Sequence, residues 1–173
     1  MKLNIGCGKD IKPGYLNCDY KLGIGVDRVF DASKSFPFDD SSCEEVYISH
    51  VLEHIFNWPE TLLECHRVLK LGGQFEIRVP YGIGWHNSDP HHVRFFSPGT
   101  MDLFTQQVTG TTYRGLDLYS QKPMFKLIKL EVRRIFWFGW HLEHYLGIKW
   151  LSGKRYRFPI GRKAEIRWIL EKI

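Results

Sequence analysis

Residues 2–8 read KLNIGCG, an apolar stretch that predicts a strand over residues 2–5 and ends in the pair Gly6 and Gly8. Glycine lacks Cβ and tolerates positive φ, so a strand that ends in Gly-x-Gly lets the backbone approach a ligand closely. A tight turn between two buried strands would use the same residues, and the pair alone is a weak signal. The stretch therefore predicts a buried first strand and a turn at which a ligand can bind.

Two further predicted strands lead into acidic residues. Residues 15–18 lead into Asp19, and residues 26–30 lead into Asp31. Because doubly wound sheets bind nucleosides at the carboxyl ends of their strands, both carboxylates are expected beside the glycine turn. Asp19 would accept both hydroxyls of a ribose, and Asp31, next to Ala32, would lie near an adenine. Three successive strand ends thus carry groups that a nucleoside needs.

The rest of the chain alternates between strands and helices. Pro59 suits the first turn of a helix, and Leu71, Gly72 and Gly73 suit its end. The expected elements are a strand at 45–49, a helix at 59–69, a strand at 74–79, a loop at 81–98, a helix at 100–107, and antiparallel strands at 125–138 and 164–172. This order predicts an α/β, Rossmann-like, doubly wound and mostly parallel sheet that ends in an antiparallel strand pair.

Five segments together resemble the class I S-adenosylmethionine-dependent methyltransferases: LNIGCG, GYLNCD, VDRVFDA, FPFDDSSCEEVYISHVLEHI and ETLLECHRVLKLGGQFEIRVP. The resemblance covers residues 2–107 and implies S-adenosyl-L-methionine as the cofactor. It implies that Gly6, Cys7 and Gly8 hold the amino acid part of that cofactor. It also implies contacts to the ribose, the adenine and the sulfonium, made by Asp19, by Asp31 with Ala32, and by Ser49 with His50, respectively.

Two features depart from that family. Asn4 stands where the family has an acidic residue, and we expect Asn4 to hydrogen-bond the cofactor without supplying a charge. Only ten residues separate Gly8 from Asp19, fewer than the ~20 that usually separate the glycine motif from the acid. A full first helix cannot fit there. We therefore expect a trimmed helical layer on one face of the sheet, covered by the C-terminal segment or by a second subunit.

Candidate catalytic residues follow from the reaction that the resemblance implies. Methyl transfer from a sulfonium is an in-line displacement, which depends chiefly on positioning of the acceptor. An acceptor hydroxyl or amine that loses a proton needs a nearby base, and histidine is the usual base near neutral pH. Of the histidines expected around the carboxyl edge of the sheet, His50 and His92 are our candidates. Exposure to solvent or a structural hydrogen bond is the alternative for each.

Residues 50–54 read HVLEH and match the HxxEH signature of inverted zinc proteases. A protease is disfavoured, because a strand is expected before His50 and a proline cuts the following helix short. The stretch also resembles part of the small-RNA 2'-O-methyltransferases, in which a glutamate and histidine cluster and a later histidine hold a divalent ion. That resemblance would place His50, Glu53, His54 and His92 at a metal. Because His50 replaces an acid of that family, zinc or no metal is favoured over magnesium.

Composition favours one domain over residues 1–173, with a cofactor-binding core at 1–110 and a basic, aromatic segment at 111–173 that closes the sheet and contacts the substrate. The chain is 43% hydrophobic and 25% charged, values typical of a folded protein. Its first residues contain no apolar run long enough for a secretory signal, and its four cysteines show no CxxC spacing. We expect a cytoplasmic protein with reduced thiols.

The positive charge lies in the C-terminal third. Residues 1–120 carry a net charge of −4 and residues 121–173 a net charge of +9. Cations alternate there with aromatic rings, as in RRIFWFGW at 133–140 and KRYRF at 154–158. The pattern predicts an anionic acceptor, a nucleic acid or a membrane surface as partner. A closing β-hairpin that packs its rings on the sheet explains the same pattern, and a homodimer also stays open.

The expected function is transfer of a methyl group from S-adenosyl-L-methionine to an oxygen or nitrogen atom of a small molecule. Three alternatives stay open: an RNA methyltransferase, a non-catalytic nucleoside-binding or scaffold protein of the same fold, and a metallohydrolase. Salt-sensitive RNA binding would favour the first. Cofactor binding without turnover would favour the second, and bound zinc the third.

Overall fold

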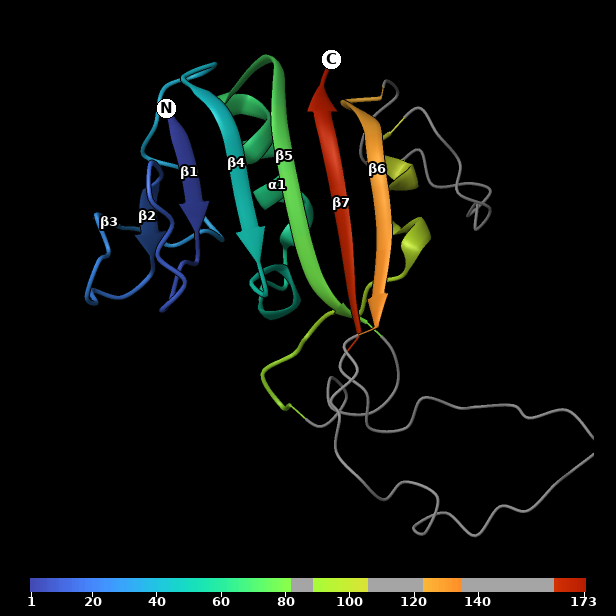
Figure 1. The fold of residues 1–173 in the computed structure, drawn as a ribbon, viewed down its shortest axis with the longest axis horizontal. Helices are drawn as coiled ribbons and strands as arrows, with labels where there is room; N and C mark the ends of the chain where they lie inside the picture. The colour runs from blue at the N-terminus through green and yellow to red at the C-terminus, as the bar shows by residue number, and fades with distance from the viewer. Residues whose placement is uncertain (82–88, 106–122, 135–163) are drawn as a thin grey trace, which may run out of the picture.

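The structure is a computed structural model that describes residues 1–81, 89–105, 123–134 and 164–173 (Figure 1). The elements in these ranges are β1 (Lys2–Ile5), β2 (Leu16–Asp19), β3 (Arg28–Val29), β4 (Cys43–Ser49), η1 (Leu52–His54), α1 (Trp58–Val68), β5 (Leu69–Tyr81), η2 (Pro98–Leu103), β6 (Phe125–Arg134) and β7 (Ala164–Lys172). η1 and η2 are 3₁₀ helices, and α1 is an α-helix.

The strands form one sheet in the order β3-β2-β1-β4-β5-β7-β6 (Figure 1). β1 pairs in parallel with β2 and with β4, and parallel pairing continues outward to β3 and to β5. β7 runs antiparallel between β5 and β6. The predicted fold class, a mostly parallel Rossmann-like sheet closed by an antiparallel strand pair, is confirmed.

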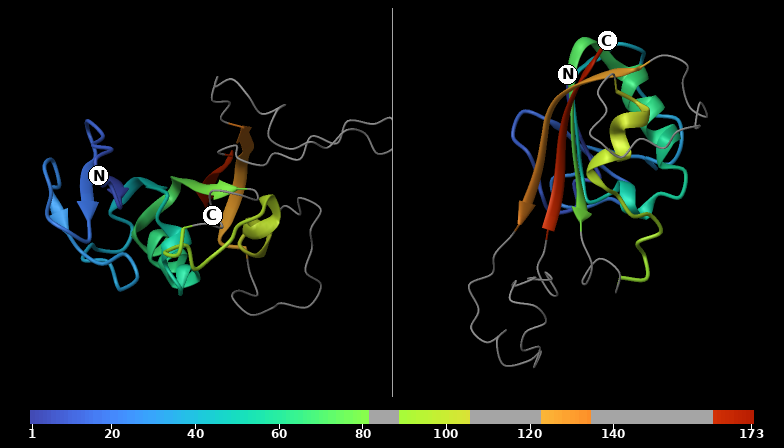
Figure 2. Two further views of the ribbon diagram at one scale, coloured as in Figure 1. Left: turned by 90° about the horizontal axis from the view of Figure 1, so that it is seen from below. Right: turned by 90° about the vertical axis from the view of Figure 1, so that its right-hand side faces the viewer.

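The hydrophobic core lies on the face of the sheet that α1 and η2 cover (Figure 2). α1 has Pro59 in its first turn, where the missing N–H removes no helical hydrogen bond. Leu62, Cys65 and Val68 are fully buried and lie at helical spacing, which gives α1 an apolar stripe toward the sheet. Trp168 of β7 is also fully buried, and its indole N–H donates to the Pro98 carbonyl at 3.2 Å. That bond ties η2 to the sheet.

The opposite face of the sheet is polar. Arg167 of β7 alternates with buried neighbours, so it points to this face, where it donates to Glu76 of β5 at 2.8 Å and to Glu131 of β6 at 3.0 Å. Lys12 Nζ lies 3.8 Å from the centre of the Tyr47 ring. No helix of the described ranges covers this face (Figure 2). Over the described residues, the helical layer on this face is therefore trimmed, as the short spacing predicted, and ion pairs lie on the surface of the sheet.

α1 agrees closely with the helix predicted at 59–69, because it runs from Trp58 to Val68. β5 differs more, since it begins at Leu69, whereas the strand was predicted to begin at residue 74. Leu69 is fully buried, pairs with Cys43 of β4, and accepts a hydrogen bond on its carbonyl from Lys172 at 2.7 Å. Strand pairing thus holds Leu69 extended, although its spacing fits the helix.

Two other elements are shorter than predicted. β3 covers only Arg28–Val29, which pair with Cys18 and Asp19 of β2, whereas the prediction was residues 26–30. The helix predicted at 100–107 is the 3₁₀ helix η2, which begins after a capping box between Ser97 and Thr100. It stops because Thr105 forms a β-bridge with Phe125. Residues 106–107 of that prediction lie outside the described ranges.

Much of the basic segment lies outside the described ranges. These ranges stop at residue 134 and resume at residue 164, so the predicted nucleic-acid or membrane contact of residues 135–163 stays a prediction. The same holds for residues 82–88 of the predicted loop. Among the helices that the structure describes, none combines the length and the apolar character needed to span a membrane.

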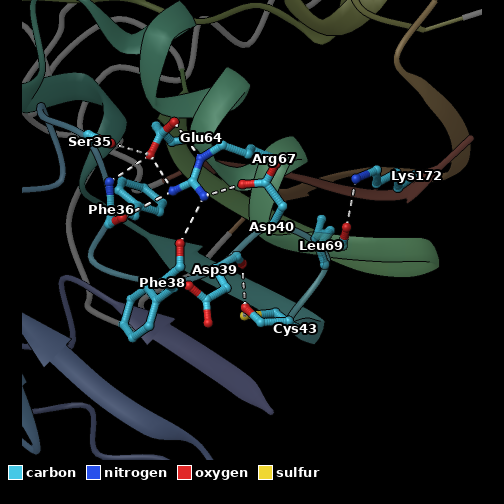
Figure 3. Close-up of polar contacts among 11 residues, drawn as sticks. Ser35, Phe36, Phe38, Asp39, Asp40, Cys43, Glu64, Arg67, Leu69 and Lys172 are labelled. Atoms are coloured by element: carbon cyan, nitrogen blue, oxygen red, sulfur yellow. Dashed lines mark hydrogen bonds and ion pairs between the residues drawn. The ribbon is translucent and has the colours of Figure 1, made fainter.

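The segment between β3 and β4 is held by one arginine on α1 (Figure 3). Arg67 donates to the main-chain carbonyls of Phe36 and Phe38, at 3.0 and 2.8 Å, and to Asp40 at 2.7 Å. It also donates twice to Glu64, one turn away on the same helix, at 2.9 and 2.8 Å. These five bonds hold an irregular segment whose backbone carbonyls have no partners in a helix or a sheet.

Candidate functional site

The carboxyl ends of the parallel strands meet at the lower edge of the sheet in Figure 1. Ile5 of β1 pairs with Cys18 of β2 and with Ile48 of β4, so the segments that follow these residues leave the sheet side by side. The antiparallel strand β7 begins at the same edge, where Glu165 pairs with Pro80. The predicted site residues at strand ends are therefore neighbours.

The glycine turn after β1 has two glycines with different surroundings. Gly6 has φ +66°, and a Cβ added to it would lie 2.2 Å from Cγ2 of Val51. Gly8 has φ +50°, and a Cβ there would meet no atom within 4 Å. Between them the Cys7 N–H donates to the Cys18 carbonyl at 2.9 Å, which fixes the turn against β2. Gly6 is thus required by close packing, whereas Gly8 faces open space.

Asp19 is the last residue of β2, and its carboxylate lies beside this turn, as predicted. Its Oδ2 accepts a hydrogen bond from the Gly8 N–H at 2.8 Å, and its Oδ1 accepts one from the Lys21 N–H at 3.2 Å. A carboxylate has about four lone-pair sites, so both oxygens can still accept bonds from a ligand. The carboxylate and the glycine turn form one unit.

Asn4 is buried and organises the segment that stands in place of a first helix. Its side-chain amide donates to the Asp10 carbonyl at 2.7 Å and to Asn17 Oδ1 at 2.8 Å. Asn17 Oδ1 in turn accepts a bond from the Lys12 N–H at 2.8 Å. Both amide hydrogens of Asn4 are therefore used within the protein, so any bond from Asn4 to a cofactor would be made by its oxygen.

Asp31 and Ala32 follow β3 and are held locally. Asp31 Oδ1 accepts hydrogen bonds from the Ser33 hydroxyl and N–H, at 2.6 and 2.9 Å, and these bonds lower the pKa of Asp31. The buried Ala32 carbonyl accepts a bond from the Thr61 hydroxyl on α1 at 3.0 Å. An ionised Asp31 thus stands at the same edge as Asp19, on a turn anchored to α1.

The four cysteines are free and buried. Burial raises the pKa of Cys18 to about 12 and raises the pKa of Cys7 and Cys65 as well. A buried thiol with a raised pKa is a poor nucleophile. These cysteines therefore serve packing, and Cys7 contributes its backbone to the turn.

His50, directly after β4, lies between two carboxylates. It has φ +54°, and its Nδ1 lies 3.3 Å from Glu53 Oε1 while its Nε2 lies 3.2 Å from Glu165 Oε2. Hydrogen bonding to Glu165, and then to Glu53, raises the pKa of His50 to about 9 against the opposing effect of burial. Both ring nitrogens face acceptors, so His50 is suited to donate hydrogen bonds.

Glu165 was not among the residues predicted from the sequence. Its carboxylate reaches His50 because β7 starts at the edge where β4 and β5 end. The signal for it was the predicted antiparallel strand at 164–172, whose first acidic residue must lie at that edge. The two residues are 115 positions apart, so only the register of β7 reveals their contact.

Three of the four suggested metal-binding residues come together. Glu53, His54 and His92 each offer a ligand atom, and these atoms lie within 4.8 Å of one another. Glu53 and His54 belong to η1, and His92 comes from the segment that crosses beside it. His50 contacts Glu53 but does not belong to this group.

Comparisons with known proteins agree with this geometry. Residues 7–77, which are 71 of the 173, match the family model described as a methyltransferase domain. The match covers less than half of the chain and shows that residues 7–77 are similar to a methyltransferase domain. The matched part of the chain runs from the glycine turn to the middle of β5 and includes Asp19, Asp31 and His50. No curated protein has a sequence that matches this chain.

Solved methyltransferases share the fold at low sequence identity. An S-adenosylmethionine-dependent methyltransferase from Archaeoglobus fulgidus is 17% identical, with a TM-score of 0.62 over 99% of this chain and 85% of that one. One from Thermotoga maritima is 17% identical, with a TM-score of 0.59 over 99% and 82%. A complex of the Haloferax volcanii Trm112 methyltransferase activator with a methyltransferase matches at 14% identity, with a TM-score of 0.60 over 99% and 81%.

The methyltransferase domain implies S-adenosyl-L-methionine as the cofactor. The residues present fit such a group, because open space lies over Gly8 and the Asp19 carboxylate lies beside the same turn. At the same edge of the sheet, the end of β4 and the start of β7 add the polar side chains of His50 and Glu165.

Proposed function

We propose that this protein transfers a methyl group from S-adenosyl-L-methionine to an oxygen or nitrogen atom of a small-molecule acceptor. The observation that carries the proposal is the glycine turn, which leaves room over Gly8 and holds Asp19 by the Gly8 N–H. A glycine turn and an acid at the carboxyl edge of a parallel sheet are the arrangement that binds nucleosides.

In this proposal the cofactor contacts are divided among the strand ends. Residues 6–8 hold the amino acid part, with the oxygen of Asn4 below them. Asp19 accepts the two ribose hydroxyls with its remaining lone pairs. Asp31 and Ala32 lie at the adenine. Ser49 and His50, at the end of β4, contact the sulfonium.

The bound cofactor supplies a methyl group activated by its sulfonium. The protein holds the acceptor atom in line with the carbon–sulfur bond, so the new bond to carbon forms as the old one breaks, and the acceptor then loses its proton. His50 and His92 are the proposed contributors. His50, whose ring nitrogens both face carboxylates, would order this edge as a hydrogen-bond donor. His92 is largely buried and meets the ring of His54 edge to face at the same edge.

Binding of S-adenosylhomocysteine tests the proposal. We expect the wild-type chain to bind one equivalent by calorimetry and Asp19→Asn to bind about 10- to 100-fold more weakly, because hydrogen bonds to a charged group contribute about 1.5–3 kcal/mol each. Asn keeps the shape of the side chain and removes the charge. Asp39→Asn is the matched control, since Asp39 is exposed and lies before β4, at the far edge of the sheet.

The outcomes separate the functions. Absence of binding by the wild-type chain contradicts the proposal, and equal binding by Asp19→Asn removes the assigned role of Asp19. Binding that is followed by no methyl transfer in a broad acceptor screen would instead favour the non-catalytic nucleoside-binding protein. RNA binding that weakens steeply with salt would favour an RNA acceptor.

The predicted partners stay part of the proposal: an anionic acceptor and a second copy of the chain. The described residues support a protein partner in one respect, because Tyr20, Leu22 and Ile24 are exposed beside β3. The complex of one structural neighbour with an activator protein is a precedent for a partner in this fold.

A further inference from the structure

We propose that Glu53, His54 and His92 bind one Zn²⁺ ion at the carboxyl edge of the sheet. Their ligand atoms lie within 4.8 Å of one another. Ligands that share a tetrahedral ion at about 2.0–2.2 Å lie about 3.4 Å apart, so small movements of the side chains would bring all three to one ion. Glu53 and His54 are adjacent on η1, and His92 reaches the same place from the segment 89–94.

Glu53 is the strongest sign of a missing cation. Its side chain is 1% exposed, and its Oε2 has no hydrogen-bond partner within the described residues. Its Oε1 lies 3.3 Å from His50 Nδ1. A buried carboxylate without hydrogen bonds is costly unless it is paired or coordinates a metal. A metal between Glu53 and the two histidines would satisfy it.

His54 already holds the tautomer that a metal needs. Its Nδ1 lies 3.1 Å from the main-chain carbonyl of His91. A carbonyl oxygen only accepts, so Nδ1 carries the hydrogen and Nε2 keeps its lone pair in the neutral ring. A hydrogen bond from one ring nitrogen to a backbone carbonyl is the usual support of a metal-binding histidine.

The segment that carries His92 is fastened to η1 by its backbone. The main-chain carbonyl of Glu53 accepts hydrogen bonds from the N–H groups of Val93 and Arg94, at 2.8 and 3.1 Å. The rings of His54 and His92 meet edge to face at 4.8 Å. Asp89 Oδ2 lies 3.7 Å from His92 Nε2, as an outer carboxylate beside a ligand. The three donors are therefore held in place before any ion arrives.

Two imidazoles and one carboxylate favour zinc over magnesium, which prefers oxygen ligands. Three protein ligands leave a fourth position of a tetrahedral ion open, as in catalytic zinc sites. His54 is exposed, so that position is open to solvent or to an acceptor. If the proposed function holds, an acceptor oxygen bound there would lose its proton more readily. Metal binding itself does not depend on that function.

The test is a titration of the metal-free, full-length chain with Zn²⁺. We expect one equivalent to bind tightly and Mg²⁺ not to compete. Glu53→Gln and His92→Ala should each weaken Zn²⁺ binding by about 100-fold, more than the about tenfold expected for the outer variant Asp89→Asn. With Co²⁺ as the probe, the visible absorption bands of a tetrahedral site should appear in the wild-type chain and be absent in Glu53→Gln.

His91→Gln is the matched control, because His91 lies in the same segment with an exposed side chain and offers only its carbonyl to His54. It should bind Zn²⁺ like the wild-type chain. A wild-type chain that binds no Zn²⁺, or binds it equally well after Glu53→Gln, overturns the site. Circular dichroism shows whether each variant is folded. Titration of the metal-free chain with S-adenosylhomocysteine separates this result from the proposed function. A chain that binds S-adenosylhomocysteine but no Zn²⁺ contradicts the metal site and leaves the proposed function standing.

Discussion

Gly6→Ala is expected to destabilise the protein by about 2–5 kcal/mol. Positive φ costs a residue with Cβ about 1–2 kcal/mol, and Gly6 has φ +66°. The added Cβ would also lie 2.2 Å from Val51 Cγ2, and overpacking a core typically costs about 1–3 kcal/mol. The midpoint of urea unfolding, with an unchanged m-value, measures the loss. Cofactor binding should fall as well, because the turn must shift.

Gly8→Ala is the matched control. It carries the same strain of positive φ, but its Cβ would meet no atom within 4 Å, so only about 1–2 kcal/mol of stability should be lost. Its methyl group would stand in the space proposed for the cofactor and should weaken binding of S-adenosylhomocysteine. The double variant Gly6→Ala with Val51→Ala should recover part of the loss of the single variant. Equal loss for the two glycine variants would contradict the packing role of Gly6.

Arg67→Met is expected to destabilise the protein by about 3 kcal/mol, because it removes hydrogen bonds that involve charged groups and leaves two partly buried carbonyls without a donor. The loss should depend on pH through Glu64. Arg67 holds the pKa of Glu64 at about 2, below its usual value of 4.5, against the opposing effect of burial. Urea unfolding at a series of pH values measures both effects.

The sign of the pH effect follows from the lowered pKa of Glu64. Above about pH 5 the carboxylate is ionised in folded and unfolded chains alike, and its full contribution to stability is present. As the pH falls toward 2 the unfolded chain takes up the proton first, so that contribution is lost. The difference in stability between the wild-type chain and Glu64→Gln should therefore shrink from pH 5 to pH 2. A difference that stays constant would show that Glu64 acts without its charge.

Lys70→Met is the control for Arg67→Met. Lys70 also pairs with a glutamate, Glu44 at 3.1 Å, but both side chains are about half exposed. An exposed pair of this kind contributes about 0–1 kcal/mol. A loss for Lys70→Met as large as that for Arg67→Met would mean that general charge, and not the hydrogen bonds of Arg67, stabilises the segment before β4.

Features that depend on neighbouring residues could be predicted from the sequence. The apolar stretch before Gly6 placed β1 at Lys2–Ile5 without error, since strand, glycine turn and burial all come from one short segment. Asp19 was expected beside the turn because β1 and β2 had to be parallel neighbours, and its bond to Gly8 places it there. The roles of these residues toward a cofactor stay predictions.

Features that depend on distant pairing could not be predicted. Leu69 fits the helical spacing of α1, but its place opposite Cys43 makes it the first residue of β5. The contact of His50 with Glu165 depends on the register of a strand that follows more than a hundred residues later. The ion pairs on the polar face could not be predicted either. A charged residue in a strand is expected to face solvent, and the sequence does not show which partner on a neighbouring strand it meets, as with Arg167 and Glu76.

The position of β7 sets the order in which the protein can be completed during synthesis. β7 is the last strand in the sequence, yet it lies between β5 and β6. While the ribosome is still making residues 135–163, one side of β5 has no strand to pair with, and β6 has no place in the sheet. Translation at about 5–20 residues per second makes this interval a few seconds long. The free edge of β5 is then open to wrong pairing, and the contact of His50 with Glu165 can form only after β7 has been made.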